Sequence, residues 1–286
     1  MTEKGALLLA GLSAMFFGTA LVTAKLGLRT IDARAGAAIS IPTATVLLLL
    51  AAPFALELSA FSMAAALLFA LVGLFFPALV TLITFEANDR LGPSVTATLS
   101  STAPLFALAA AFLLLGERIP ARALIATVGV AAGAALLSWR GGALVRRALW
   151  LPLTGAALRG LAQVVAKAGL VLWPNPFAAS LIGYAVSSAT VTAAHRLGRR
   201  APARHSRAAL GWFMATGILN GAAVLLMYAA LNGAPVSLVA PLVACYPLVT
   251  VLIGAAVLRE EALDARVVGG VLVIVAAIAY LVAGTL

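Results

Sequence analysis

The chain has 286 residues, of which 64% are hydrophobic and only 10% are charged. About a quarter of the residues in soluble globular domains are charged, so this composition excludes a soluble domain and indicates a protein embedded in a lipid bilayer. Cys245 is the only cysteine, which excludes both a disulfide framework and a cysteine metal site within one chain.

Ten apolar runs follow one another along the chain, with short polar breaks between them. Each run is near the ~20 residues that an α-helix needs to cross the hydrocarbon core of a bilayer. The sequence therefore predicts an all-α polytopic membrane protein with ten transmembrane helices. The predicted helices cover residues 5–28, 36–56, 62–85, 93–115, 121–139, 149–172, 177–194, 208–230, 235–258 and 267–285.

The net charge of +10 arises from 19 Lys and Arg against nine Asp and Glu, and the basic residues are unequally distributed. Counted in alternate loops, thirteen lie on one side of the membrane and three on the other. Because basic loops stay in the cytoplasm, we expect both termini on the outer side. The densest basic stretch, residues 195–207, is interpreted as a topology anchor that contacts anionic lipid, not as a nucleic-acid site.

The sequence repeats itself at an offset of 142 residues. VTAKLGL at 22–28 aligns with VVAKAGL at 164–170, which places Lys25 on Lys167. The further aligned pairs are Pro93 with Pro235 and, after a slip of one residue, Pro104 with Pro247 and Glu117 with Glu260. Each half has five helices, an odd number, so the halves 1–142 and 143–286 enter the membrane in opposite senses. Inverted repeats are typical of secondary transporters, which bind substrate near the bilayer midplane.

Three segments carry a resemblance to a known family. LGPSVTATLSSTAPLFALAAAFLLLGERIP at 91–120 and APVSLVAPLVACYPLVTVLIGAAVLREE at 234–261 resemble the fourth and ninth helices of the EamA family in the drug/metabolite transporter superfamily. FFGTALVTAKLGL at 16–28 resembles the first helix of that family, lysine included. The resemblance covers essentially the whole chain and implies a ten-helix carrier of metabolites. The best-known bacterial members export amino acids, aromatic ones included.

The resemblance, taken with the loop charges, leads us to expect a multi-pass protein of the bacterial inner membrane with both termini in the periplasm. One feature departs from the family pattern. Many relatives have a basic loop between the second and third helices, whereas here that loop holds only Glu57 and the basic loop lies between the seventh and eighth.

All nine carboxylates lie in loops or at the ends of predicted helices. The four-helix multidrug members of the superfamily resemble one another in having a glutamate in the first helix, which exchanges protons for cationic drugs. This chain has no carboxylate at that depth, so an antiporter of cationic drugs is disfavoured.

Basic side chains occur inside the predicted sixth helix instead. Arg159, Gln163 and Lys167 are spaced by four residues and therefore share one face. Arg159 lies ~15 Å from the nearer helix end, a depth at which a charge must face protein or water. We expect Arg159 to face a central cavity and bind a substrate carboxylate with two parallel hydrogen bonds; the alternative is a buried contact with a backbone carbonyl or a neighbouring helix. The neutral candidates for binding an ammonium group are Ser101, Asn220, Tyr228 and Tyr246, and Gln163 is a further candidate for binding the substrate.

The two aligned lysines lie toward opposite mouths of the expected carrier. One interpretation is that they snorkel to the membrane surface. The other is that they gate the two mouths, Lys167 with Glu117 outside and Lys25 with Glu260 or Glu86 inside. Pro104 and Pro247 fall inside predicted helices, where proline favours a kink that can open one end of the carrier.

The predicted function is secondary transport by alternating access around a central cavity, with export of neutral or aromatic amino acids. The alternative is a carrier of phosphorylated or nucleotide-type metabolites. An enzyme is not expected, because the chain has no HExxH, GxSxG, Walker A or GxGxxG motif. We expect no cofactor and no metal; the partners are the small-molecule substrate and membrane lipid, with no nucleic acid. The sequence favours neither a monomer nor a homodimer.

Overall fold

A computed structural model describes residues 2–138, 148–197, 207–258 and 265–283. Within these residues the chain forms helices and no strand, as its composition predicts. The helices are α1 Glu3–Leu28, α2 Ala33–Ala55, α3 Met63–Phe75, α4 Ala78–Leu91, α5 Pro93–Ser100, α6 Ala103–Leu115, α7 Ala121–Ser138, α8 Trp150–Leu172, α9 Pro176–Leu197, α10 Arg207–Gly233, α11 Val236–Val243, α12 Tyr246–Val257 and α13 Ala265–Ala283.

Three of the predicted helices are each broken into two segments, α3 and α4, α5 and α6, and α11 and α12. The first break lies at Pro77, which lacks the N–H that would continue the hydrogen-bond ladder. Pro104 and Pro247 each occupy the second residue of the segment after a break. An N–H in the first turn of a helix has no intrahelical acceptor, so proline is tolerated there. The kinked but continuous helices expected at these two prolines are therefore interrupted helices instead.

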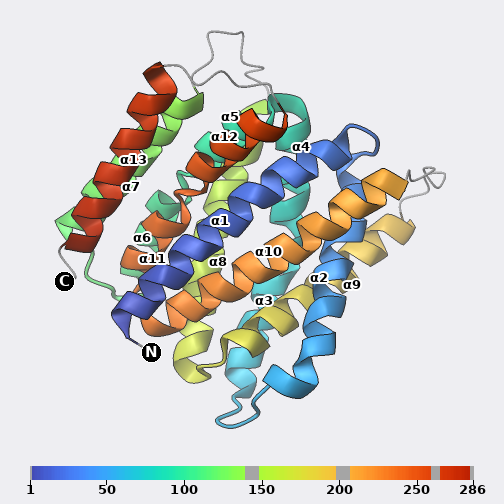
Figure 1. Cartoon of the computed structure of the whole chain (residues 1–286). Coiled ribbons are helices and arrows are strands. Elements are labelled where there is room, and N and C mark those ends of the chain that lie inside the picture. The colour runs from blue at the N-terminus through green and yellow to red at the C-terminus, as the bar shows by residue number, and fades with distance from the viewer. Residues whose placement is uncertain (1, 139–147, 198–206, 259–264, 284–286) are drawn as a thin grey trace.

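The helices form a bundle in which distant parts of the chain lie side by side. Helix α1 makes its most extensive contact with α10, and α10 also packs along α2 (Figure 1). Helices α7 and α13 pair with each other at one edge. Helix α1 leads away from the side where both termini lie, and α8 runs in the opposite sense (Figure 1). The opposed α1 and α8 are the first long helices of the two sequence repeats.

Two aligned glycines bring the repeats into contact at the centre. A Cβ atom on Gly18 of α1 would lie 2.7 Å from the carbonyl oxygen of Tyr246, at the start of α12. A Cβ atom on Gly160 of α8 would lie 2.7 Å from the carbonyl oxygen of Ala103, at the start of α6. Only glycine allows a backbone approach this close. Each repeat therefore packs its first helix against a broken helix of the other repeat.

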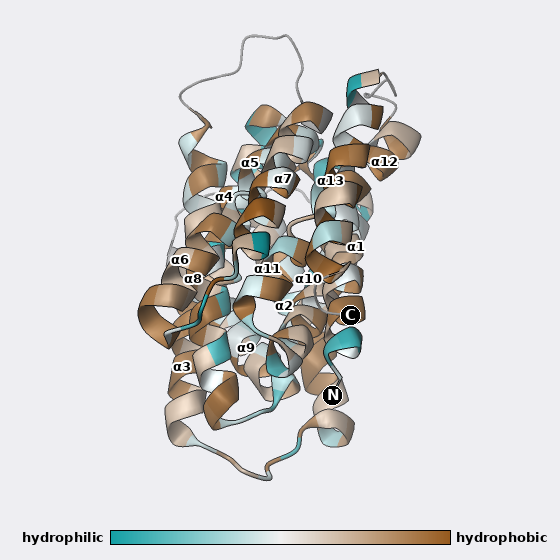
Figure 2. Cartoon of the chain, turned by 90° about the vertical axis from the view of Figure 1, so that its left-hand side faces the viewer, coloured by the Kyte–Doolittle hydropathy of each residue, from teal (hydrophilic) through white to brown (hydrophobic). Residues whose placement is uncertain are grey.

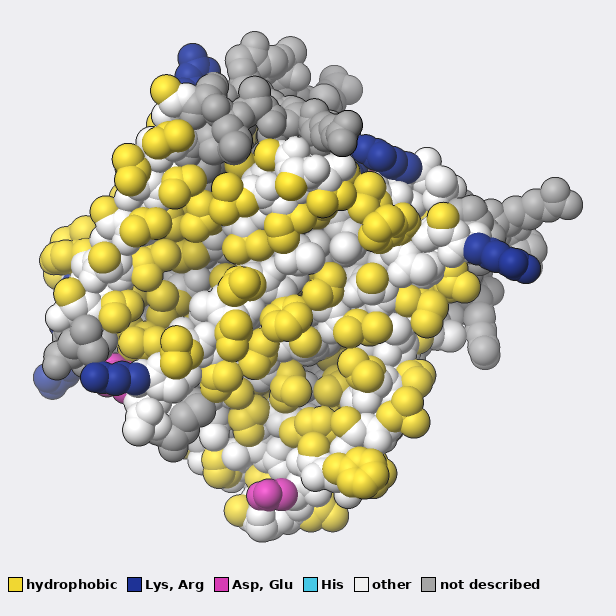
Figure 3. Space-filling model, viewed as in Figure 1, with side chains coloured by type: hydrophobic (Ala, Val, Ile, Leu, Met, Phe, Trp, Pro, Cys, Tyr) yellow, Lys and Arg dark blue, Asp and Glu magenta, His cyan; other side chains and the backbone are white. Residues whose placement is uncertain are grey.

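The outer surface of the bundle is apolar. Figure 2 shows mostly brown and pale residues along the helices, and Figure 3 shows apolar side chains over the middle of one face with charged side chains near its edges. In the described residues, eight helical segments are long and apolar enough to cross a membrane, and two shorter apolar helices accompany them. The chain is therefore a multi-pass membrane protein, and a total of ten spans stays a prediction.

We predict that Gly18→Ala and Gly160→Ala each lower the stability of the purified protein. The added methyl group meets backbone atoms that cannot rotate away, and overpacking of this kind costs about 1–3 kcal/mol. Thermal unfolding in detergent measures the effect. Gly11→Ala is the matched control, because a Cβ at Gly11 meets no atom within 4 Å. Equal midpoints for Gly11→Ala and Gly160→Ala would contradict the proposed close packing.

Candidate functional site

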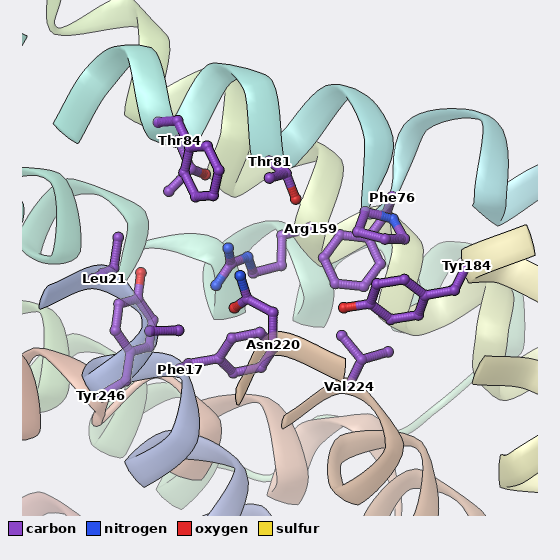
Figure 4. A pocket seen from close by; sticks show the side chains of 13 residues that line it. Phe17, Leu21, Phe76, Thr81, Thr84, Arg159, Tyr184, Asn220, Val224 and Tyr246 are labelled. Atoms are coloured by element: carbon purple, nitrogen blue, oxygen red, sulfur yellow. The ribbon is translucent and has the colours of Figure 1, made fainter. Parts of the chain in front are cut away.

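A small cavity lies between α1, α4, α8, α9, α10 and α12. Its volume is ≈ 30 Å³, room for on the order of one water molecule. A solute the size of an amino acid can enter only if the surrounding helices move apart. The lining residues are Phe17, Ala20, Leu21, Phe76, Pro77, Thr81, Thr84, Phe85, Arg159, Tyr184, Asn220, Val224 and Tyr246 (Figure 4).

Arg159 is the charged residue of this cavity. Its side chain is only 8% exposed, and its Cζ atom lies 5.0 Å from the ring centre of Phe17, 5.7 Å from that of Tyr246 and 6.0 Å from that of Phe76. Its Nε–H has no hydrogen-bond partner, and none of the described carboxylates pairs with it. Contact with an aromatic face stabilises a cation by about 0.5–2 kcal/mol, whereas burying an ion costs several kcal/mol. The guanidinium therefore lacks full compensation until an anion or water binds it.

The position of Arg159 follows from the sequence repeat. At the offset of 142 residues, Arg159 of α8 aligns with Phe17 of α1, just as Gly160 aligns with Gly18. The close packing at the two glycines holds these equivalent residues at the centre, where the cation of one repeat lies over the aromatic ring of the other. The structure thus places one charge and one apolar ring at symmetry-related positions.

Neutral polar groups surround the guanidinium. Figure 4 shows the Asn220 amide beside Arg159 and the Tyr184 hydroxyl directed toward the middle of the cavity. Tyr184 and Tyr246 are each 2% exposed, and neither hydroxyl makes a hydrogen bond within the described part of the chain. The Ser100 side chain lies near the Tyr246 hydroxyl, but the two groups do not form a hydrogen bond. Buried hydroxyls are normally hydrogen-bonded, so these two are available to a ligand.

Three of the six residues predicted to bind substrate line the cavity, namely Arg159, Asn220 and Tyr246. The other three, Gln163, Tyr228 and Ser101, do not line it. Gln163 is buried with its Oε1 atom unpaired. The Ser101 hydroxyl donates a hydrogen bond to the Thr98 carbonyl at 2.6 Å, within the break between α5 and α6.

Tyr184 on α9 and Thr81 and Thr84 on α4 also line the cavity, although the sequence did not predict them. The i, i+3 spacing of the two threonines in an apolar span was a detectable signal. Tyr184 was harder to predict, because a tyrosine indicates a binding site only where its position is known to be deep in the membrane. Among the described residues, no group of three or more His, Cys, Asp or Glu is arranged to hold a metal ion.

The two aligned lysines bind backbone carbonyl groups. Lys25 Nζ donates to the carbonyls of Asn88 and Asp89, both at 3.3 Å, in the last turn of α4. Lys167 Nζ donates to the carbonyls of Leu231 at 2.6 Å and Ala234 at 3.1 Å, where α10 ends. The last carbonyls of a helix have no intrahelical partner and carry partial negative charge. Each ammonium group therefore caps a helix that leads into one of the short segments α5 and α11.

The carboxylate predicted to pair with Lys167 lies at the same junction. Glu117 Oε1 accepts a hydrogen bond from the Val236 amide at 2.9 Å, and Oε2 accepts one from the Ser237 amide at 3.2 Å. These amides belong to the first turn of α11, so an anion is favourable there. Instead of forming a direct ion pair, Glu117 holds the start of α11 while Lys167 holds the end of α10.

The structure describes only one of the two carboxylates that were predicted to pair with Lys25. Glu260 lies outside the described residues. Glu86, the other expected partner, binds Arg90 on its own helix, with Nε to Oε1 at 2.7 Å. Among the described residues, the partners of Lys25 are therefore the backbone carbonyls and not a carboxylate.

Comparison with known proteins identifies the scaffold. The model of the EamA-like transporter family matches the chain twice, at residues 4–139 and 146–282. A protein of known crystal structure shares 16% identity with this chain, and the match covers 98% of this chain and 96% of the other with a TM-score of 0.75. At that identity the likeness shows the fold alone. None of the curated proteins matches the chain.

We predict that Lys167→Met destabilises the protein by about 1.5–3 kcal/mol, the range expected for lost hydrogen bonds to a charged group. The carbonyls at the end of α10 lose their cation, while the methylene stem that packs there is largely kept. Thermal unfolding in detergent measures the change. Lys4→Met is the control, because Lys4 is exposed near the start of α1. If both variants unfold at the same temperature as the intact protein, Lys167 does not hold the junction.

Proposed function

The chain belongs to the EamA-like transporter family and is a membrane transporter; from this premise we propose that it exports neutral and aromatic amino acids across a bacterial inner membrane. The proposed carrier works as a secondary transporter, by alternating access around the cavity that contains Arg159. The halves 1–142 and 143–286 act as two inverted five-helix repeats, and both termini are periplasmic.

The observation that carries this proposal is the buried guanidinium of Arg159, which pairs with none of the described carboxylates. Arg159 presents a fork of N–H donors that matches a carboxylate in two parallel hydrogen bonds. Binding a substrate anion there supplies the charge compensation that the described residues lack. The same residue makes a cationic substrate unfavourable, because two like charges would share a poorly solvated site.

The remaining lining of the cavity suits the rest of an amino acid. Phe76, Phe85 and Val224 offer apolar surface to a side chain. The Asn220 carbonyl oxygen and the tyrosine hydroxyls can accept hydrogen bonds from an ammonium group. Roles for Gln163, Tyr228 and Ser101 behind this lining remain predictions.

Alternating access is supported by the small size of the cavity. A volume of ≈ 30 Å³ requires the helices to separate before a substrate can bind, and discontinuous helices next to a central site are typical of secondary transporters. The junctions capped by Lys25 and Lys167 are the places where α4 meets the short segment α5 and where α10 meets the short segment α11. We propose that these junctions, with Glu117 and the breaks before Pro104 and Pro247, act as hinges of the two gates.

We predict that Arg159→Gln reduces counterflow of labelled phenylalanine into proteoliposomes loaded with unlabelled phenylalanine. The expected loss is at least ~10-fold, since hydrogen bonds to a charged group contribute about 1.5–3 kcal/mol. Arg159→Lys should be intermediate, because an ammonium keeps the charge and loses the planar fork.

The control for this experiment is Arg118→Gln, which removes an exposed charge between α6 and α7. Exchange that persists undiminished in Arg159→Gln would remove Arg159 from the substrate site. If the intact protein exchanges no amino acid but exchanges a sugar phosphate, the carrier belongs to the phosphorylated-metabolite class instead.

A further inference from the structure

A second hollow lies on the outside of the bundle, between the starts of α2 and α8 and the outward face of α4. Its volume is ≈ 510 Å³. Arg34, Arg90 and Trp150 line one end of this groove, and Leu79, Leu82 and Ile83 line the rest. The groove thus joins a basic end to an apolar wall.

The basic end can bind an anion. Arg34 is exposed, and no hydrogen bond or ion pair engages it within the described part of the chain. Arg90 uses its Nε and Nη2 atoms to bind Glu86, which leaves three of the five N–H donors of a guanidinium free. Two arginines against one glutamate give this end a formal charge of one positive unit.

The groove has the length of one membrane leaflet. Leu79 and Arg90 are eleven residues apart on α4, which corresponds to ~16 Å of helix rise. Half of a ~30 Å hydrocarbon core is ~15 Å. Trp150 is 57% exposed at the basic end, a position typical of tryptophan at the boundary between lipid tails and headgroups.

We propose that this groove binds one anionic phospholipid, with its phosphate at Arg34 and Arg90 and an acyl chain along Leu79, Leu82 and Ile83. Basic pockets between transmembrane helices bind anionic headgroups. A soluble phosphate would leave the apolar wall uncovered, and a zwitterionic lipid would gain less from the positive end. The charge and the apolar wall together therefore select an anionic lipid.

The bound lipid contacts the back of a helix that forms the central cavity. Thr81, Thr84 and Phe85 on the opposite face of α4 line that cavity, whereas Leu82, Ile83 and Glu86 line the groove. An occupied groove therefore supports α4 from the lipid side. This inference does not depend on which solute is transported.

Native mass spectrometry of the full-length protein in detergent tests the site, with phosphatidylglycerol and phosphatidylcholine as probes. We expect the intact protein to retain phosphatidylglycerol preferentially. The double variant Arg34→Gln/Arg90→Gln should bind it roughly 30-fold more weakly, since each arginine near a membrane surface contributes about 1 kcal/mol of attraction to anionic lipid. Glu86→Gln should change binding in the opposite direction, to about fivefold tighter, because it removes the negative charge of the groove.

The control Arg118→Gln/Arg207→Gln removes two exposed arginines elsewhere and should leave the affinity for phosphatidylglycerol unchanged. The proposal is overturned if the intact protein does not discriminate between the two lipids, or if Glu86→Gln weakens the binding. It is also overturned if glycerol 3-phosphate and phosphatidylglycerol displace the bound lipid equally well, since the site would then recognise a free anion. If the intact protein is a dimer and the groove variants are monomers, the occupant of the groove is a second copy of the chain, and the lipid proposal is overturned.

Discussion

The arrangement at the centre of this transporter depends on one buried positive charge for which the described residues supply no counter-charge. Arg159 lies over three aromatic rings, and no described carboxylate pairs with it. The rings offset only part of the several kcal/mol that burying an ion costs. A fold selected for stability alone would place an apolar residue there, as the first repeat does with Phe17. The uncompensated guanidinium therefore supports our proposal that a substrate anion binds there.

The two repeats share the residues of the framework and differ in residues that line the cavity. Residues that are alike in both repeats build the framework: Gly18 and Gly160 let the helices approach at the centre, and Lys25 and Lys167 cap the ends of α4 and α10. The repeats differ at the cavity, where Arg159 stands at the position that Phe17 occupies in the first repeat. An asymmetric substrate, with a charged end and an apolar end, fits a site in which one symmetry-related position is polar and the other is aromatic.

The sequence predicted much of the fold because hydrophobicity dictates where a helix can cross a bilayer. Residue patterns predicted the membrane class, the repeat at an offset of 142 residues, the family and the position of Arg159 at the cavity. The breaks between segments were less accessible, since Ser101 and Thr102 interrupt a run that reads as continuous helix. The backbone partners of the lysines were not predicted, for a physical reason: carboxylates are visible in a sequence, whereas free carbonyls at a helix end become visible only in three dimensions. Tyr184 was missed because its depth depends on how α9 packs.

The central claim is that Arg159 recognises a substrate carboxylate. The most direct test is to measure equilibrium binding of two ligands to the purified protein. The ligands are phenylalanine and phenylalanine amide, in which an uncharged amide replaces the carboxylate. The two ligands share a side chain and an ammonium group, so they differ at the end assigned to Arg159. We predict that phenylalanine binds at least ~10-fold more tightly than the amide, in line with hydrogen bonds to a charged group, and that Arg159→Gln abolishes the difference. Equal affinities of the intact protein for both ligands, with measurable binding of each, would contradict the account.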